Sequence, residues 1–167
     1  QKIGIDKFKI FLYDTGVLGK INFDIEEVGQ PQPVTWGKCK LATASFGHGI
    51  NTNLLQLTKG YAIISNGGYD VKPTLIKKET EVYKKTIITK ATSQKINSIL
   101  RKIVVTGTAK LANVDGYEIG GKTGTANKTI NGVYTNKKIN TFASVFPISK
   151  PQFVFVVLIY SYTVSAS

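Results

Sequence analysis

A short glycine-rich run that carries one lysine and two threonines is the part of this sequence best suited to chemistry. It spans Gly120 to Ala126 and reads GGKTGTA. The ammonium of Lys122 would attract a substrate carboxylate and influence proton transfer to or from a nearby serine. The hydroxyls of Thr123 and Thr125 would bind the same carboxylate. We interpret the run as a strand that forms one wall of an acyl-transfer site.

The glycine and the backbone inside this run have separate roles in that interpretation. Gly124 would let the substrate approach the strand closely, because any Cβ there would collide with it. The amide of Thr125 would help to stabilise the oxyanion of a tetrahedral intermediate. Taken alone, the stretch from Lys122 to Thr125 is equally compatible with an ordinary turn and an exposed lysine.

A phosphate-binding loop is the second chemistry that this part of the sequence formally matches. The segment from Gly116 to Thr123 satisfies the pattern of such a loop. That kind of site needs a buried strand before the loop and a helix directly after it. Residues 110–115 are too polar for a central strand, and residues 124–129 have no helical period. The surroundings therefore argue against nucleotide binding.

The composition excludes several other classes of site. The net charge is +12, but Arg101 is the only arginine and the lysines are scattered, a pattern that does not favour nucleic-acid binding. The single Cys39 excludes an internal disulfide. The single His48 has no acidic or thiol partners at metal-binding spacing, so we expect no metal site. Between Gly47 and Gly49, His48 is expected to serve a turn or to cap a polar loop, and we interpret Gly47 and His48 as structural.

Three helices and a loop are expected in the first two thirds of the chain. Apolar spacing predicts helices over residues 5–13, 52–65 and 93–105, with a loop over 15–35. Thr52 and Thr92 are the predicted N-caps of the second and third helices. The second helix should end in left-handed residues at 66–68, and the third at Gly107.

The last third of the chain has the pattern of an antiparallel meander. Strands are predicted over residues 117–123, 140–146 and 153–160, and Asn131-Gly132 indicates a hairpin. The apolar run at 153–160 is predicted to be a buried central strand, and it is far too short to cross a membrane. Together with the helices, this pattern predicts an α/β fold of the α+β type, an antiparallel sheet flanked by helices.

Several ordered motifs resemble one family over nearly the whole chain. They are residues 44–49 (ASFGHG), 61–68 (YAIISNGG), 73–75 (PTL), 104–109 (VVTGTA), 116–126 (GYEIGGKTGTA) and 143–147 (ASVFP). In this order they resemble the transpeptidase domain of class B penicillin-binding proteins. The Gly-His-Gly variant is more similar to the cell-division members than to the elongation members. The resemblance implies a penicillin-binding transpeptidase/β-lactamase-like fold, with catalytic Lys122 and Thr125 and with substrate-binding Lys122, Thr123, Gly124 and Thr125.

The sequence also departs from that family. The family has Thr-Pro where this chain has Thr52-Asn53, which removes a favourable first-turn proline. The family also needs a Ser-x-x-Lys nucleophile motif and a Ser-x-Asn motif, and no serine of this chain fits either. We therefore expect residues 1–167 to be the C-terminal part of a single domain whose nucleophile-bearing part is absent, so that the fold is incomplete.

The resemblance implies a penicillin-sensitive D,D-transpeptidase that cross-links peptidoglycan stem peptides through a serine outside this chain. No cofactor is implied. The expected partners are the D-Ala-D-Ala end of the stem peptide, β-lactam antibiotics, the remainder of the domain, and divisome or elongation membrane proteins. The parent protein would be anchored in the bacterial inner membrane with this domain in the periplasm. Two alternatives stay open, namely a β-lactam-sensing domain without turnover and a non-catalytic interaction module.

Overall fold

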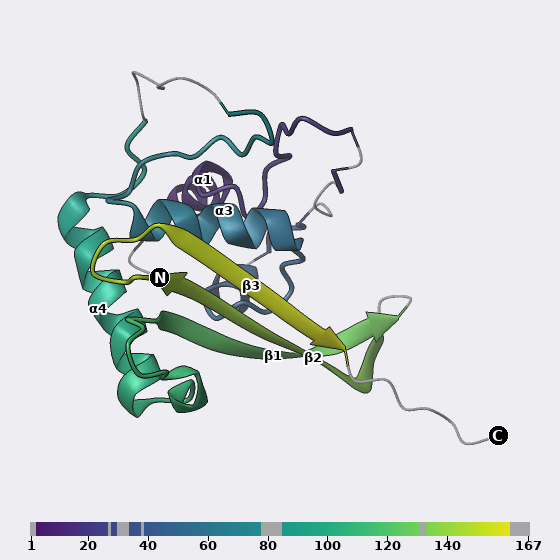
Figure 1. The fold of residues 1–167 in the computed structure, drawn as a ribbon. Coiled ribbons are helices and arrows are strands. Elements are labelled where there is room, and N and C mark those ends of the chain that lie inside the picture. The colour runs from purple at the N-terminus through teal and green to yellow at the C-terminus, as the bar shows by residue number, and fades with distance from the viewer. Residues whose placement is uncertain are drawn as a thin grey trace. The chain divides into compact units, whose positions relative to one another are not determined.

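The computed structural model describes residues 3–26, 28–29, 34–37, 39–77, 85–130 and 133–160. The chain divides into two compact units, Gln1–Gln94 and Lys95–Ser167, and each is described by itself (Figure 1). The first unit contains helices α1 (Ile5–Asp14), α2 (Lys40–Ala44) and α3 (Leu54–Ser65). The second unit contains the sheet. Helix α4 (Lys90–Thr106) begins in the first unit and continues into the second.

Helix α1 and the segment after it agree with the sequence-based expectation. The helix buries Leu12, and its C-cap is Thr15, whose hydroxyl donates to the carbonyl of Phe11 at 2.9 Å. The described residues between 15 and 35 form no helix or strand, as predicted, and residues 27 and 30–33 lie outside the described ranges.

Helix α3 is confirmed, but its predicted N-cap is wrong by one residue. The cap is Asn53, whose side chain accepts a hydrogen bond from the amide of Gln56 at 2.8 Å. The side chain of Gln56 accepts from the amide of Asn53 in return, so the two residues form a capping box. Asn53 stands where the family that the motifs resemble has proline, and its capping box gives the helix a stable start by a different route. Thr52 instead donates its hydroxyl to the side chain of Gln56.

Two glycines form the predicted left-handed end of α3, although Asn66 itself has a negative φ. The φ angles of Gly67 and Gly68 are 97° and 91°, which favour glycine strongly. A Cβ at Gly68 would also lie 2.0 Å from the carbonyl oxygen of Ile88. The hydroxyl of Ser93 accepts from the amide of Gly67, so the turn is held to the start of α4.

Helix α4 starts earlier than predicted. Thr89, and not Thr92, precedes its first turn, and the hydroxyl of Thr89 accepts from the amide of Thr92 at 3.1 Å. The helix ends before Gly107, as expected. Of the apolar residues of this helix, Leu100 and Val104 are buried, whereas Ile99 is 50% exposed.

The second unit holds a three-stranded antiparallel sheet in the order β1-β2-β3 (Figure 1). Its strands are β1 (Gly120–Ile130), β2 (Val133–Phe146) and β3 (Phe153–Tyr160), and the short 3₁₀ helix η1 (Lys110–Ala112) lies before them. The first strand starts three residues later than predicted and both β1 and β2 extend much further toward the hairpin. These polar extensions have no apolar alternation, so the sequence pattern did not reveal them. Ile130 pairs with Val133, while residues 131–132 of the predicted hairpin lie outside the described ranges.

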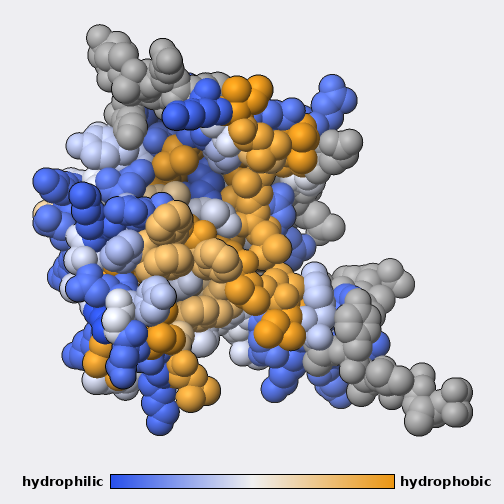
Figure 2. Space-filling model, in the orientation of Figure 1, coloured by the Kyte–Doolittle hydropathy of each residue, from blue (hydrophilic) through white to orange (hydrophobic). Residues whose placement is uncertain are grey.

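The bounds of β3 match the prediction, but its burial does not. Within the part of the chain that the structure describes, β3 pairs with β2 alone and is an edge strand. Phe153, Phe155 and Ile159 are 54%, 59% and 61% exposed, and Val154 and Val156 on the opposite face are half-buried. Apolar side chains accordingly gather along β3 on the face seen in Figure 2. The predicted central, buried strand is therefore wrong for the described sheet.

Candidate active site

All predicted site residues lie together on β1, at the open edge of the sheet. Lys122 pairs with Ala143, and Thr125 pairs with Asn140 on the neighbouring strand. Among the described residues β1 has no strand partner on its other side. Half of its backbone amides and carbonyls are therefore available to another molecule or another part of the protein.

The lysine and the two threonines occupy opposite faces of β1, since successive residues of a strand alternate. Lys122 shares its face with Gly124, and Thr123 shares the other face with Thr125. The exposed ammonium of Lys122 nevertheless donates a hydrogen bond of 2.5 Å to the carbonyl oxygen of Thr123. The positive charge is thereby brought to the strand's backbone next to the threonines.

Each threonine hydroxyl has a distinct partner. The Oγ1 atoms of Thr123 and Thr108 lie 3.1 Å apart, and either hydroxyl can be the donor. The hydroxyl of Thr125 donates to Oδ1 of Asn140 at 3.1 Å. Thr123 is half-buried and Thr125 is exposed. Both hydroxyls are therefore oriented by neighbours, one by the turn after α4 and the other by β2.

Two glycines at the start of β1 fix how closely the strand packs. A Cβ at Gly120 would lie 2.7 Å from the side chain of Ile148, and one at Gly121 would lie 2.8 Å from the carbonyl oxygen of Ala143. Both contacts are shorter than real Cβ atoms show, so a side chain at Gly120 would force Ile148 to shift, and one at Gly121 would displace the strand. At Gly124 the nearest atom would be Cβ of Thr141 at 3.9 Å, an ordinary contact. The chain's own packing therefore explains the first two glycines and leaves Gly124 unexplained.

The residues just before β1 are held from two sides. Nη1 of Arg101 donates to the carbonyl of Ile119 at 2.9 Å and to Oδ1 of Asn113 at 3.0 Å. On the other side, the amide of Ile148 donates to the carbonyl of Glu118 at 2.7 Å, and the hydroxyl of Ser149 donates to the carboxylate of Glu118. The sequence-based reasoning missed the positioning contact of Arg101. The sequence offered one indication of this role, which is that Arg101 is the only arginine of the chain.

The structure contradicts a phosphate-binding loop. The residues after Gly120 continue as a strand as far as Ile130, so no helix N-terminus follows the loop to face a phosphate. A 3₁₀ turn and coil, and no buried strand, precede it. In the described ranges, no three His, Cys, Asp or Glu side chains are grouped to hold a metal ion.

The Gly-His-Gly sequence lies in the first unit, in the turn that follows α2. Gly47 and Gly49 have φ angles of 89° and 71°. The amide of His48 donates to the carbonyl of Thr43 at 2.9 Å, and the ring of His48 lies 5.8 Å from that of Phe46. These contacts fit the expected turn. That His48 and Gly47 have a structural role only stays a prediction.

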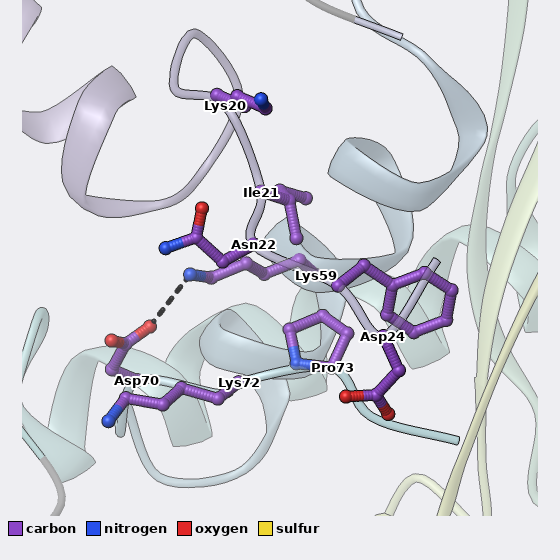
Figure 3. Close-up of a pocket in the computed structure, with 9 residues that line it drawn as sticks. Lys20, Ile21, Asn22, Asp24, Lys59, Asp70, Lys72 and Pro73 are labelled. Atoms are coloured by element: carbon purple, nitrogen blue, oxygen red, sulfur yellow. Dashed lines mark ion pairs between the residues drawn. The ribbon is translucent and has the colours of Figure 1, made fainter. Parts of the chain in front are cut away.

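A cavity of about 360 Å³ lies within the first unit, and none of the residues that line it is a predicted site residue. Its lining combines charged residues with uncharged ones, namely Lys20, Asp24, Lys59, Asp70 and Lys72 with Ile21, Asn22, Phe23 and Pro73 (Figure 3). Lys59 extends toward Asp70, with Nζ 3.1 Å from a carboxylate oxygen. Asp24 accepts from the hydroxyl of Thr74 and from the amide of Leu75. These contacts join α3 to the segment around Asp70, and the segment around Asp24 to residues 74–75.

No helix in the described part of the chain has the length and apolar character to span a membrane. This finding concerns the described helices alone.

Comparisons with known proteins identify the family. The family model of the penicillin binding protein transpeptidase domain matches residues 1–166. The probable peptidoglycan D,D-transpeptidase PenA of Neisseria flavescens is 35% identical over 127 residues, which are 74% of this chain and 32% of that protein. The peptidoglycan D,D-transpeptidase FtsI of Escherichia coli is 33% identical over 131 residues, which are 77% of this chain and 22% of that protein.

A solved structure with a similar fold comes from the same kind of protein. The transpeptidase domain of penicillin-binding protein 3 from Burkholderia pseudomallei superposes with a TM-score of 0.85 at 23% identity, over 93% of this chain and 49% of that one. The chain thus spans a third or less of the two curated relatives and about half of the solved domain. Its helices and antiparallel sheet are those of the penicillin-binding transpeptidase/β-lactamase-like fold, in incomplete form. With the family model matching nearly every residue, the chain belongs to the penicillin-binding protein transpeptidase domain family.

Proposed function

We propose that residues 1–167 are the C-terminal part of a single transpeptidase domain, and that the whole protein is a serine-type D,D-transpeptidase. It would cross-link peptidoglycan stem peptides. The family match over residues 1–166 supports this proposal, as do relatives whose names carry the same activity. The chain covers a third or less of the length of those relatives. This coverage supports a nucleophile on another part of the protein.

The observation that carries the proposal is the contrast between the glycines of β1. Gly120 and Gly121 are explained by close contacts inside the chain, whereas a Cβ at Gly124 would make only an ordinary contact with Thr141. A glycine without an internal reason, next to an exposed lysine, fits a position where substrate lies against the strand.

In the proposed mechanism β1 binds the end of the acyl donor. Lys122 and the hydroxyl of Thr123 would bind the carboxylate of the terminal D-Ala, with Lys122 also supplying the field for proton transfer. The amide of Thr125 would donate to the developing oxyanion. The carbonyl of Thr123 accepts from the Lys122 ammonium. In a strand, backbone groups two residues apart point to the same side, so the amide of Thr125 points to the side of that carbonyl. The hydroxyl of Thr125 donates to Asn140, so the amide is the main contribution of this residue.

The chemical step would take place at a serine outside this chain. The serine oxygen attacks the carbonyl of the penultimate D-Ala, its proton passes to a base, and the peptide bond to the terminal D-Ala breaks as that amine is protonated. The amine of a second stem peptide then attacks the ester and releases the serine. β-Lactams would acylate the same serine because they present a carboxylate and a reactive carbonyl at similar positions. No cofactor takes part in these steps.

The partners and location follow from the same assignment. Among the described residues β3 has no strand on its outer edge, and its apolar face is exposed; both features support the remainder of the protein's own domain as the partner that covers them. Attachment to the inner membrane, a periplasmic domain, a cell-division role and contacts with divisome or elongation proteins are parts of the proposal that rest on the family alone.

Fluorescent penicillin tests the proposal directly. The full-length protein should become labelled at a serine outside residues 1–167, and residues 1–167 alone should not. Covalent labelling within residues 1–167 would overturn the assignment. A β-lactam-sensing domain would also be labelled, but it would neither release D-Ala from a stem peptide nor turn over. An interaction module would not be labelled at all.

A further inference from the structure

Thr108 lies outside the motif that carries the proposed chemistry, yet it contacts that motif directly. It follows α4 in the turn Gly107-Thr108-Ala109, and its hydroxyl oxygen is 3.1 Å from that of Thr123. We propose that Thr108 is a positioning residue that donates to Oγ1 of Thr123 and so directs the proton of Thr123 toward the substrate carboxylate. This inference rests on the proposed function of β1.

The backbone at Thr108 is fixed from both sides. The amides of Gly107 and Ala109 both donate to the carbonyl of Ile103, at 3.0 and 3.3 Å. A Cβ at Gly107 would lie 2.7 Å from that same carbonyl oxygen, so the tight turn requires glycine. Ala109 is 3% exposed. The hydroxyl of Thr108 is therefore presented to β1 from a rigid turn.

The hydroxyl itself is not required for packing. Thr108 is exposed, and the contact with Thr123 is the one hydrogen bond of its side chain in the described part of the chain. A polar group that is exposed has no need of a protein partner, since water would serve equally well. The contact is thus better explained by what it does to Thr123 than by the stability of the turn.

The direction of the shared hydrogen bond decides what Thr123 offers to a ligand. A threonine hydroxyl has one proton and two acceptor lone pairs. If Thr123 donated to Thr108, only its lone pairs would remain, and these repel a carboxylate. If Thr108 donates, the proton of Thr123 is free for the carboxylate, and the chain of two hydrogen bonds polarises in the same direction. A bound carboxylate therefore selects the second arrangement.

Three variants at position 108 and its surroundings test this role in the full-length protein. Thr108→Val removes the hydroxyl at nearly constant shape, and Thr108→Ser restores it. Thr106→Val is the matched control, because the hydroxyl of Thr106 bonds to the carbonyl of Lys102 in α4 and not to β1. The measured quantity is the second-order rate of acylation by benzylpenicillin and by its methyl ester, in which the carboxylate is blocked.

Thr108→Val should lower acylation by benzylpenicillin by roughly threefold to tenfold, because Oγ1 of Thr123 loses the neutral hydrogen bond that orients it. Acylation by the ester should stay unchanged, and Thr108→Ser should recover most of the lost rate. In the double variant with Thr123→Val, Thr108→Val should cause no further loss, because it acts through Thr123. Thr106→Val should behave as the unmodified protein.

The alternative outcomes separate this inference from the proposed function. An equal loss with benzylpenicillin and its ester would mean a structural role and overturn the inference. If Thr123→Val lowers acylation by benzylpenicillin and Thr108→Val does not, Thr108 has no positioning role, while the proposed function stands. If Thr123→Val and Lys122→Ala both leave the rate unchanged, the carboxylate site on β1 is itself wrong.

Discussion

The ammonium of Lys122 donates to the carbonyl oxygen of Thr123 at 2.5 Å, although the two side chains start on opposite faces of β1. The lysine folds along the strand instead of projecting from its face. This arrangement brings the cation to the backbone of β1 beside Thr123. The side chain of Lys122 is exposed and, among the described residues, forms no ion pair. It therefore contributes little to the stability of the fold.

Lys122→Ala in the full-length protein should therefore reduce acylation without affecting the fold. The second-order rate with fluorescent penicillin should fall by roughly a hundredfold or more, the range seen when a preorganised electrostatic group is removed. The melting temperature should stay within about 1 °C of the original, because an exposed side chain contributes little to stability. Lys102→Ala, an exposed lysine of α4, is the control. An unchanged acylation rate in the Lys122 variant would refute the role given to it.

The glycines of β1 give a paired prediction. Gly121→Ala should destabilise the protein by about 1–3 kcal/mol, because its Cβ would overlap the carbonyl of Ala143. Gly124→Ala should cost less than about 1 kcal/mol, since only Thr141 lies near. Acylation by penicillin should nevertheless fall in the Gly124 variant, measured at a temperature where both proteins are folded. Normal acylation by a well-folded Gly124→Ala protein would mean that substrate does not lie against this position.

The capping box of α3 gives a third test, on stability alone. Asn53→Ala should lower the free energy of unfolding by about 1 kcal/mol, because the amide of Gln56 loses its acceptor. Asn53→Asp should retain most of the stability, since a carboxylate accepts the same bond at a helix N-terminus. Urea unfolding of the full-length protein measures both. If Thr52→Ala proved more damaging than Asn53→Ala, Thr52 and not Asn53 would be the functional cap.

Burial raises the pKa of Tyr61 above its ordinary value of 10.0, which leads to a prediction about alkaline pH. The folded protein holds this proton more tightly than the unfolded chain. The resulting stabilisation is complete below the unfolded pKa and is lost as pH rises through the folded one. Tyr61→Phe lacks the titrating group. The difference in unfolding free energy between variant and original should be constant below about pH 9 and shift in favour of phenylalanine near pH 11.

Tyr117→Phe, at an exposed tyrosine, controls for loss of a hydroxyl as such. Urea unfolding at several pH values measures the difference for both variants. A difference for Tyr61→Phe that does not change between neutral and strongly alkaline pH would show that burial of Tyr61 does not affect its ionisation.

Local patterns in the sequence determined much of this protein. The bounds of α1 and β3, the existence of α3 and α4, and the left-handed glycines after α3 follow from apolar spacing and from the conformations that glycine allows. Candidate chemistry at Lys122–Thr125 was also predicted from the sequence, from its residue types together with the ordered motifs around it, and it stays a prediction. The ordered motifs around Lys122 indicated the penicillin-binding transpeptidase family, and the family match over residues 1–166 confirmed it.

Other features were decided only by the tertiary structure. Asn53 and Thr89 cap their helices because their side chains reach particular amides, which residue preference alone did not distinguish from Thr52 and Thr92. The exposure of β3 depends on which strands pair with it, not on its own apolar residues. The contacts of Thr108 with Thr123 and of Arg101 with Ile119 join residues 15 and 18 positions apart, so they exist only once α4 and β1 have packed together.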